Sequence, residues 1–163
     1  MTNQNDIADD FNTFMNAIFD KDIDYLRKNI EFVQDINAIH ERTNSTPLIM
    51  AIEAEDYEII NLLLQNGADI NAQTHQGWTP LHVAIAEASD DYQRAMAENN
   101  YSEEITPPTE MIEYLLKLHP NLELKRFDGK TPAEMIPGWK KLHDLIEKEK
   151  QWQRENNSDK NAY

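Results

Sequence analysis

The chain of 163 residues contains no cysteine and only four glycines. Without cysteine it has neither disulfides nor thiolate metal sites, which is compatible with a reducing compartment. None of the glycines belongs to a GxGxxG, GxxxxGK[ST] or GxSxG pattern. The sequence therefore lacks the phosphate-binding loops of nucleotide-binding proteins and the nucleophile elbow of hydrolases.

Basic residues are half as frequent as acidic ones, with 15 lysines and arginines against 30 aspartates and glutamates and a formal net charge of −15. The excess lies in residues 1–116, which hold 22 acidic and 5 basic side chains. The electrostatic field of these acidic side chains repels the phosphates of nucleic acids, so we predict no direct binding of DNA or RNA. It would speed the encounter with a basic protein, although an acidic surface can also serve only to keep a protein soluble.

Long apolar runs are missing as well. No stretch of the sequence approaches the roughly 20 apolar residues needed to cross a bilayer. Residues 1–6 lack the basic and apolar regions of a secretory signal. We therefore expect a cytoplasmic protein that makes no contact with membranes.

A recurring tripeptide is the strongest positive signal. Thr-Pro-Leu stands at residues 46–48 and again at 79–81, 33 residues later, and Thr-Pro-Ala follows at 131–133. Threonine can cap a helix N-terminus and proline suits the first helical turn, so each copy predicts the start of a helical element. A period of this length is typical of repeats that stack to share one core.

The middle copy continues as Thr-Pro-Leu-His-Val-Ala at residues 79–84 and matches the ankyrin signature T-P-L-H-x-A at every fixed position. Before it, residues 59–72 look like the second helix of an ankyrin repeat, its terminating Gly67 and the descent into a β-turn. The chain therefore resembles an ankyrin-repeat protein. The resemblance implies an all-α solenoid of about four helix-turn-helix repeats with β-turn fingers, in which His82 hydrogen-bonds backbone between repeats.

The repeats carry several departures from that pattern. They are predicted at about residues 7–37, 38–71, 72–123 and 124–155, the last as a C-terminal cap, within a single ankyrin-repeat domain over residues 5–155. Val33 replaces the glycine that would end the second helix of the first repeat. The first finger has one extra residue and Thr43-Asn44 where glycine is expected.

The third repeat contains 19 extra residues, which the alignment of its helices places at residues 89–108. Ala88, Tyr92 and Met96 follow Ile85 at helical spacing, so the first helix of this repeat is predicted to run on by two or three turns. A loop then leads to Thr109, which can cap the next helix. Tyr92 and Met96 are also candidates for packing on a neighbouring helix.

The C-terminal segment is predicted to form a helix from Trp139 to about Glu155. Leu142, Leu145 and Ile146 are expected in its core-facing stripe. Trp152 either folds back on the cap or begins a second contact patch. Residues 156–163 are polar and are predicted to be a disordered tail.

Candidate chemical sites are weak. The five histidines form no close metal-ligand pair along a helix. His40 and His75 fall at nearly equivalent places on adjacent predicted fingers, but nothing supplies the further ligands of a zinc site. The acidic pairs, at residues 9–10, 90–91 and 103–104, lack the pattern of a calcium loop. We predict no enzyme activity, no metal and no cofactor.

A recognition surface remains. Proteins of the family that this chain resembles bind partners with their finger tips and the exposed side of their first helices. The resemblance implies contacts from His40, Glu41, Arg42 and Ser45 on the first finger, from Gln73, His75, Gln76 and Trp78 on the second, and from Lys125, Arg126, Phe127 and Lys130 on the third. The groove would add Phe19, Asp20, Glu53, Ala54, Ala86 and Glu87, and the insertion Asp90, Asp91, Tyr92 and Tyr101. Trp78 and Phe127 stand out as large aromatic side chains at turn positions, with packing against a neighbouring finger as the alternative for each.

The predicted function is a non-catalytic protein-interaction module that binds and inhibits a basic partner. A sharper form is an antidote to a basic toxin, because immunity proteins of bacterial competition systems include ankyrin-repeat members. The alternatives are a passive adaptor or scaffold, and an enzyme or ligand-binding protein with its site in the insertion and groove. The protein alone is expected to be a monomer.

Overall fold

Helices form all the regular elements in the part of the chain that the structure describes, so the predicted all-α fold is confirmed. The computed structural model describes the backbone of residues 4–98 and 106–158 and the side chains of residues 11–98 and 106–156. The chain divides into two compact units, residues 1–80 and 81–163. The single domain expected over residues 5–155 stays a prediction.

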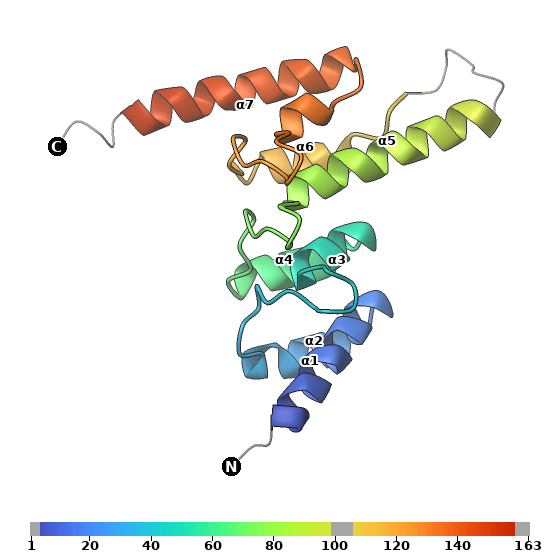
Figure 1. The fold of residues 1–163 in the computed structure, drawn as a ribbon, viewed down its shortest axis with the longest axis vertical. Coiled ribbons are helices and arrows are strands. Elements are labelled where there is room, and N and C mark those ends of the chain that lie inside the picture. Colours follow the sequence, from blue (N-terminus) through green and yellow to red (C-terminus); the bar gives the residue numbers. More distant parts are fainter. Residues whose placement is uncertain (1–3, 99–105, 159–163) are drawn as a thin grey trace. The chain divides into compact units, whose positions relative to one another are not determined.

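The first unit contains two helix pairs. The first pair is α1 (Gln4–Phe19) and α2 (Ile23–Asn29), and the second is α3 (Pro47–Glu53) and α4 (Tyr57–Gln65). Within this unit α1 packs on α3 and α2 packs on α4, so that one pair stacks on the other (Figure 1). Stacked helix pairs are the arrangement that the repeat pattern predicts.

The connection between the two helices has the same geometry in both pairs. Asp22 and Asp56, 34 residues apart, are the N-cap residues of α2 and α4, and each carboxylate accepts a backbone hydrogen bond at 3.0 Å. The residue before each cap, Lys21 or Glu55, has left-handed backbone with φ of 57° or 52°. These turns rest on a few neighbouring residues, which is why the repeat can be recognised in the sequence.

The predicted helix start at Thr46 and helix stop at Gly67 are confirmed, whereas the first repeat ends its second helix in a different way. The Thr46 hydroxyl accepts the Ile49 N–H at 3.3 Å, and Gly67 takes a left-handed φ of 92° just after α4. Val33 has φ −70° and ψ 118°, and α2 ends through the 3₁₀ turn η1 (Ile30–Phe32). A β-branched side chain strongly disfavours left-handed backbone, so the first repeat closes without the glycine type of stop.

Apolar side chains from all four helices fill the core of the first unit. The largest fully buried ones are Phe14, Met15, Ile18, Leu26, Leu48, Ile49, Ile52, Ile59, Ile60 and Leu63. Burying a side chain of this size contributes roughly 1.5–3 kcal/mol relative to leaving it in water. Packing between the pairs therefore dominates the stability, while the caps and turns fix the register.

The second unit contains α5 (Pro80–Glu98), α6 (Glu110–Leu116), the 3₁₀ turn η2 (Pro132–Met135) and α7 (Lys140–Ser158). Helix α5 has 19 residues where α3 has 7, so the predicted continuation of the first helix into the insertion is confirmed. The core of this unit includes Leu81, Ile85, Ile112, Leu115, Leu122, Leu142 and Ile146.

Three details of the second unit correct the sequence analysis. Helix α7 continues to Ser158, so the first residues of the predicted tail are helical, and residues 159–163 lie outside the described part. Leu145 is half-buried and not in the core. Thr109 stands at the N-cap of α6, but its hydroxyl donates to the Glu113 carboxylate at 2.7 Å and caps no backbone N–H.

Candidate protein-binding surface

Two of the predicted fingers are closed by the same pair of backbone hydrogen bonds. In the second finger, residues 74–78, the first N–H donates to the last carbonyl at 2.9 Å and the Gly77 N–H donates to the first carbonyl at 2.9 Å. In the third finger, residues 126–130, the bonds are 3.0 Å and, from Gly129, 2.9 Å. Gly77 and Gly129 have φ of 80° and 82°, a region that glycine enters without steric cost.

The first finger, residues 40–45, is one residue longer. The His40 N–H donates to the Ser45 carbonyl at 2.9 Å, and these two residues form an isolated β-bridge. Asn44 takes the place of the finger glycine, with φ of 51°, and its N–H donates to the His40 carbonyl at 2.8 Å. The extra residue and the missing glycine noted in the sequence are thus accommodated by one asparagine, a residue that tolerates left-handed backbone.

Asn44→Gly is expected to raise the free energy of unfolding by about 0.5–1 kcal/mol. Glycine removes the cost of left-handed backbone, and it also removes a buried Asn44 Oδ1 that has no hydrogen-bond partner in the described structure. Urea denaturation of both proteins measures the difference.

Gly67→Ala is the matched control and should act in the opposite direction, because Gly67 has φ of 92° and open space around an added Cβ, which leaves backbone strain as the change. A less stable Asn44→Gly protein would show that the asparagine side chain stabilises the finger.

The predicted contact residues differ in exposure, and their role in binding stays a prediction. Tyr101 lies outside the described residues. The exposed ones are Glu41, Arg42, Glu53, His75, Gln76, Glu87, Asp90, Lys125 and Phe127, and the half-buried ones are Trp78, Asp91, Tyr92 and Arg126.

His40 is not a surface residue, which corrects its placement among the finger contacts. It is buried, its Nε2 lies 2.6 Å from Asn12 Oδ1 and its Nδ1 lies 3.0 Å from the Thr43 hydroxyl. The ring also meets Phe11 edge-on. Ser45, the other end of this finger, is buried as well. His40 therefore fastens the first finger to α1, whereas His75 on the second finger is exposed.

The two aromatic candidates have separate environments. Phe127 lies on the third finger and is 79% exposed. Trp78 is half-buried, and its backbone N–H donates to the Thr74 hydroxyl at 3.2 Å inside the second finger. Part of Trp78 therefore serves packing, while Phe127 has most of its apolar surface open to a partner.

His82 performs the role that the resemblance implies. Its ring is fully buried, and Nε2 lies 3.2 Å from the Lys130 carbonyl at the end of the third finger. A carbonyl only accepts, so Nε2 carries the proton and donates it. Burial lowers the pKa of His82, and the bond to Lys130 opposes part of that effect.

Acidification from pH 7.5 to 5.5 is expected to reduce the stabilising contribution of the two buried histidines. Burial lowers the pKa of both His82 and His40 below 6.5 in the folded protein. As the pH falls through about 6.5, the unfolded chain binds protons that the folded chain does not, so stability falls and levels off below the folded pKa values. Imidazole NMR titration checks the first step, and thermal unfolding of wild type against His40→Gln checks the second, with a smaller loss expected in the variant. Folded-state titration of both rings at or above 6.5 would contradict the prediction.

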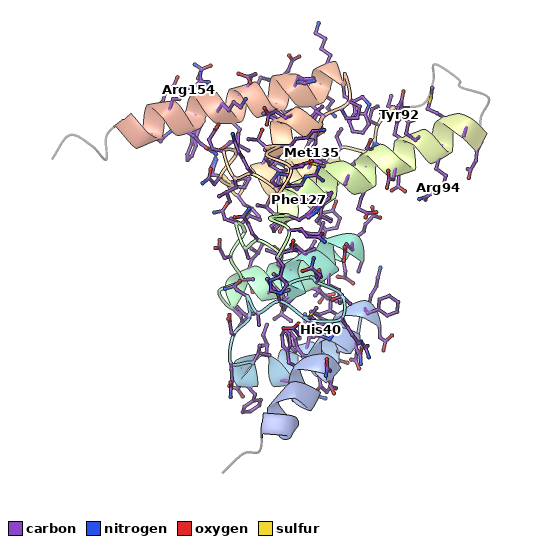
Figure 2. The ribbon with its side chains drawn as sticks, viewed as in Figure 1. His40, Tyr92, Arg94, Phe127, Met135 and Arg154 are labelled. Atoms are coloured by element: carbon purple, nitrogen blue, oxygen red, sulfur yellow. The ribbon has the colours of Figure 1, made fainter. Side chains whose placement is uncertain are left out.

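The acidic candidates on α5 have different surroundings. Glu87 and Asp90 are exposed, whereas Asp91 pairs with Arg94 at 3.0 Å. Tyr92 and Arg94 lie on opposite sides of α5 (Figure 2). Tyr92 meets Trp139 edge-on at 5.4 Å, which anchors the extended helix to the segment that leads into α7. Tyr92 therefore packs on a residue just before α7 and not on a helix, and its role in partner binding stays a prediction.

A cluster that the sequence analysis did not assign lies at the other side of the second unit. His119, which follows α6, stacks on Trp152 of α7 with ring centroids 3.5 Å apart. Its Nδ1 is 3.0 Å from the carboxylate of Glu149, which is buried. One signal was available, because His119 stands 52 residues after Gly67, the same offset as between Thr79 and Thr131. A histidine in the place of a helix-ending glycine marks an unusual position.

The described residues contain neither a cluster suited to a metal ion nor a helix suited to a membrane. No three histidine, aspartate or glutamate side chains among them are grouped as a metal site would require. None of the helices over residues 4–98 and 106–158 is both long and apolar enough to cross a membrane.

Comparison with known proteins places these observations in a family. A model of ankyrin repeats, in three copies, matches residues 14–106. The BRCA1-associated RING domain protein 1 of Caenorhabditis elegans is 28% identical over 141 residues, which are 86% of this chain and 17% of that protein. Human protein phosphatase 1 regulatory subunit 27 is 29% identical over 97 residues, 59% of this chain and 51% of that protein. The chain spans about half or less of the length of these relatives.

A solved structure agrees with the fold. The crystal structure of the ankyrin repeat domain of Bcl-3, described as a unique member of the IkappaB protein family, matches with a TM-score of 0.61 at 22% identity. The match covers 82% of this chain and 50% of that one.

Proposed function

The chain belongs to the ankyrin-repeat family, and from that premise we propose that it is a non-catalytic module that binds, and by binding inhibits, a basic partner protein. Ankyrin repeats mediate protein–protein interaction, and the relatives include regulatory subunits of protein phosphatase 1. Several finger residues in both units are exposed, as a recognition surface requires. The observation that carries the proposal is Phe127, which is 79% exposed on a turn closed by hydrogen bonds.

Charge supports the choice of a basic partner. Residues 1–80 contain 14 acidic and 4 basic side chains, a net charge of −10. Exposed carboxylates at the end of α3 and along α5, Glu53, Glu87 and Asp90, would attract lysine and arginine on a partner. The most specific form of this proposal is inhibition of a basic toxin, because covering the surface of the toxin would be enough to inhibit it.

Neutralising Glu53, Glu87, Asp90 and Asp91 together is expected to slow association about tenfold at low salt and to flatten its dependence on salt, with little change in dissociation. Asp91 should contribute least, because Arg94 already pairs with it. The partner is first captured from the source cell with the wild-type protein, and rates are then measured on a biosensor from 50 mM to 500 mM salt.

The matched control neutralises four exposed carboxylates elsewhere, Asp24, Glu31, Glu123 and Asp144, which changes the net charge by the same amount. A general effect of net charge would slow both variants equally, and this result would show that Glu53, Glu87, Asp90 and Asp91 have no special part in the encounter. A captured partner that is itself acidic would overturn the proposal of a basic one.

A further inference from the structure

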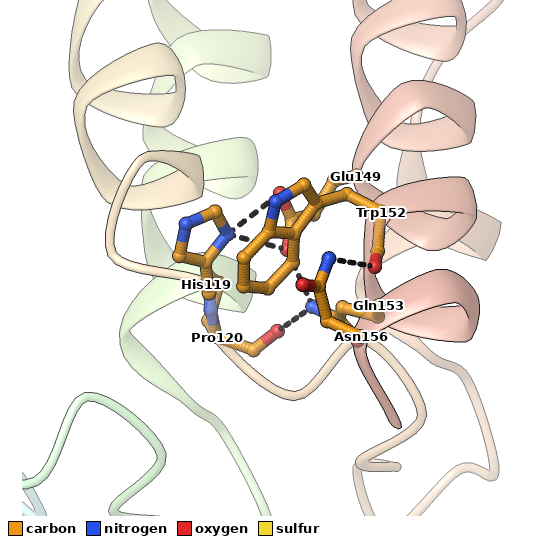
Figure 3. A network of polar contacts seen from close by, with 6 residues as sticks. All are labelled: His119, Pro120, Glu149, Trp152, Gln153 and Asn156. Atoms are coloured by element: carbon orange, nitrogen blue, oxygen red, sulfur yellow. Dashed lines mark hydrogen bonds and ion pairs between the residues drawn. The ribbon is translucent and has the colours of Figure 1, made fainter. Parts of the chain in front are cut away.

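Side chains of α7 contact two consecutive residues of the chain segment after α6, His119 and Pro120. Figure 3 shows the His119 and Trp152 rings close together. The two rings stack, with an angle of 8° between their planes. His119 Nδ1 lies 3.0 and 3.1 Å from the two carboxylate oxygens of Glu149. The Gln153 amide donates to the Pro120 carbonyl at 2.8 Å and to Glu149 at 2.7 Å. Three side chains of α7 thus hold two consecutive residues of the segment.

The two halves of α7 are attached by different forces. The first half buries Leu142 and Ile146 almost completely in the core of the second unit. In the second half, over residues 147–156, Glu149 is the one buried side chain and no apolar side chain is buried. The distal half therefore depends on the polar and aromatic contacts to His119 and Pro120.

The backbone of His119 indicates that these contacts have a specific role. Its φ is 53°, in the left-handed region, at the position where Gly67 ends the corresponding helix with φ of 92°. Glycine would take this conformation with less strain. Ending the helix therefore does not by itself require a histidine at this position. The imidazole gains the stack on Trp152 and the pair with buried Glu149.

The same segment leads directly into the third finger. After His119 and Pro120 the chain buries Leu122 and then forms the turn of residues 126–130 that carries Phe127. The far end of this turn is held by the bond from His82 to the Lys130 carbonyl. The finger thus has one anchor on α5 and, through the segment that precedes it (residues 119–125), a second anchor on α7.

We propose that His119 is a latch that fastens the distal half of α7 to the base of the third finger, so that α7 is a releasable strap controlling the mobility of that finger. The part of this proposal that concerns partner binding rests on the proposed function, because it assumes that Phe127 contacts the partner. The conformational coupling between strap and finger does not depend on any partner.

Hydrogen exchange of the full chain tests the latch, with His119→Gly as the main variant. Loss of the latch should speed exchange about tenfold both in residues 150–156 and in the finger, residues 126–130, and trypsin should cut earlier after Lys150 and Arg154. Trp152→Ala, which leaves the backbone of His119 unchanged, should give the same pattern even if His119→Gly fails to fold. His143→Ala, at an exposed position of α7 outside the network, serves as the control and should leave exchange in both segments unchanged.

Two results would overturn the proposal. Unchanged or slower exchange in α7 of His119→Gly would mean that His119 is an ordinary helix stop that glycine improves. Faster exchange in α7 with an unchanged finger would mean that strap and finger are independent. Neither result bears on whether Phe127 binds a partner, so failure here is distinguishable from failure of the proposed function.

Discussion

Replacing His82 by alanine is expected to lower the free energy of unfolding by roughly 2–4 kcal/mol. The ring is fully buried, so its removal leaves a cavity in the protein interior. It also deprives the Lys130 carbonyl of the Nε2 donor at 3.2 Å, across 48 residues of chain. Calorimetry or urea denaturation measures the loss.

His143→Ala is the control for this measurement. His143 is exposed on α7, and surface substitutions of this kind usually change stability by about 0.5 kcal/mol or less. Equal stabilities of the two variants would show that the buried histidine and its bond to the third finger contribute little. Hydrogen exchange on His82→Ala should place the largest increase in residues 126–130, since that turn loses its anchor on α5.

Phe127→Ala is expected to speed dissociation of the partner about thirtyfold, the equivalent of about 2 kcal/mol, and to leave association nearly unchanged. A buried aromatic anchor acts on dissociation because its contacts form after the encounter. Stability should not change, since the ring is 79% exposed before binding. Biosensor kinetics with the captured partner measure both rates.

Phe32→Ala provides a matched control, because Phe32 is 72% exposed and belongs to η1, not to any of the three fingers. Equal effects of both substitutions would point to non-specific stickiness of exposed phenylalanine. An unchanged complex with Phe127→Ala would remove the third finger from the binding surface. Trp78→Ala is less suitable as a test because Trp78 is half-buried, so the substitution mixes folding with binding.

Local signals explain why much of the helical pattern was predictable. Threonine and proline start α3, glycine follows α4, and the stripe of Ala88, Tyr92 and Met96 continues α5. Each of these features is determined by residues within a few positions of one another. It can therefore be recognised in the sequence alone. The end of α7 at Ser158 was misjudged because no glycine or proline follows the good helix formers that precede it, so the helix continues through the weaker helix formers of residues 156–158.

The environment of side chains that project from the turns was not predictable in the same way. His40 and His75 occupy similar places on adjacent fingers. His40 is buried and lies 2.6 Å from Asn12 of α1, whereas His75 is exposed. Trp78 and Phe127 are both turn aromatics, and their different exposure depends on which neighbouring elements reach them. Leu145 lies within the apolar stripe of α7 but is only half-buried.

The sequence by itself determined the repeat, the helix starts, the extended helix of the insertion and the excess of negative charge, because each is a property of neighbouring residues or of composition. Only the tertiary structure decided which finger residues are open to a partner and that His119 meets Trp152 and Glu149. Those contacts join residues about 30 positions apart in the chain. Their existence depends on how α6 and α7 pack, and no local pattern encodes that packing.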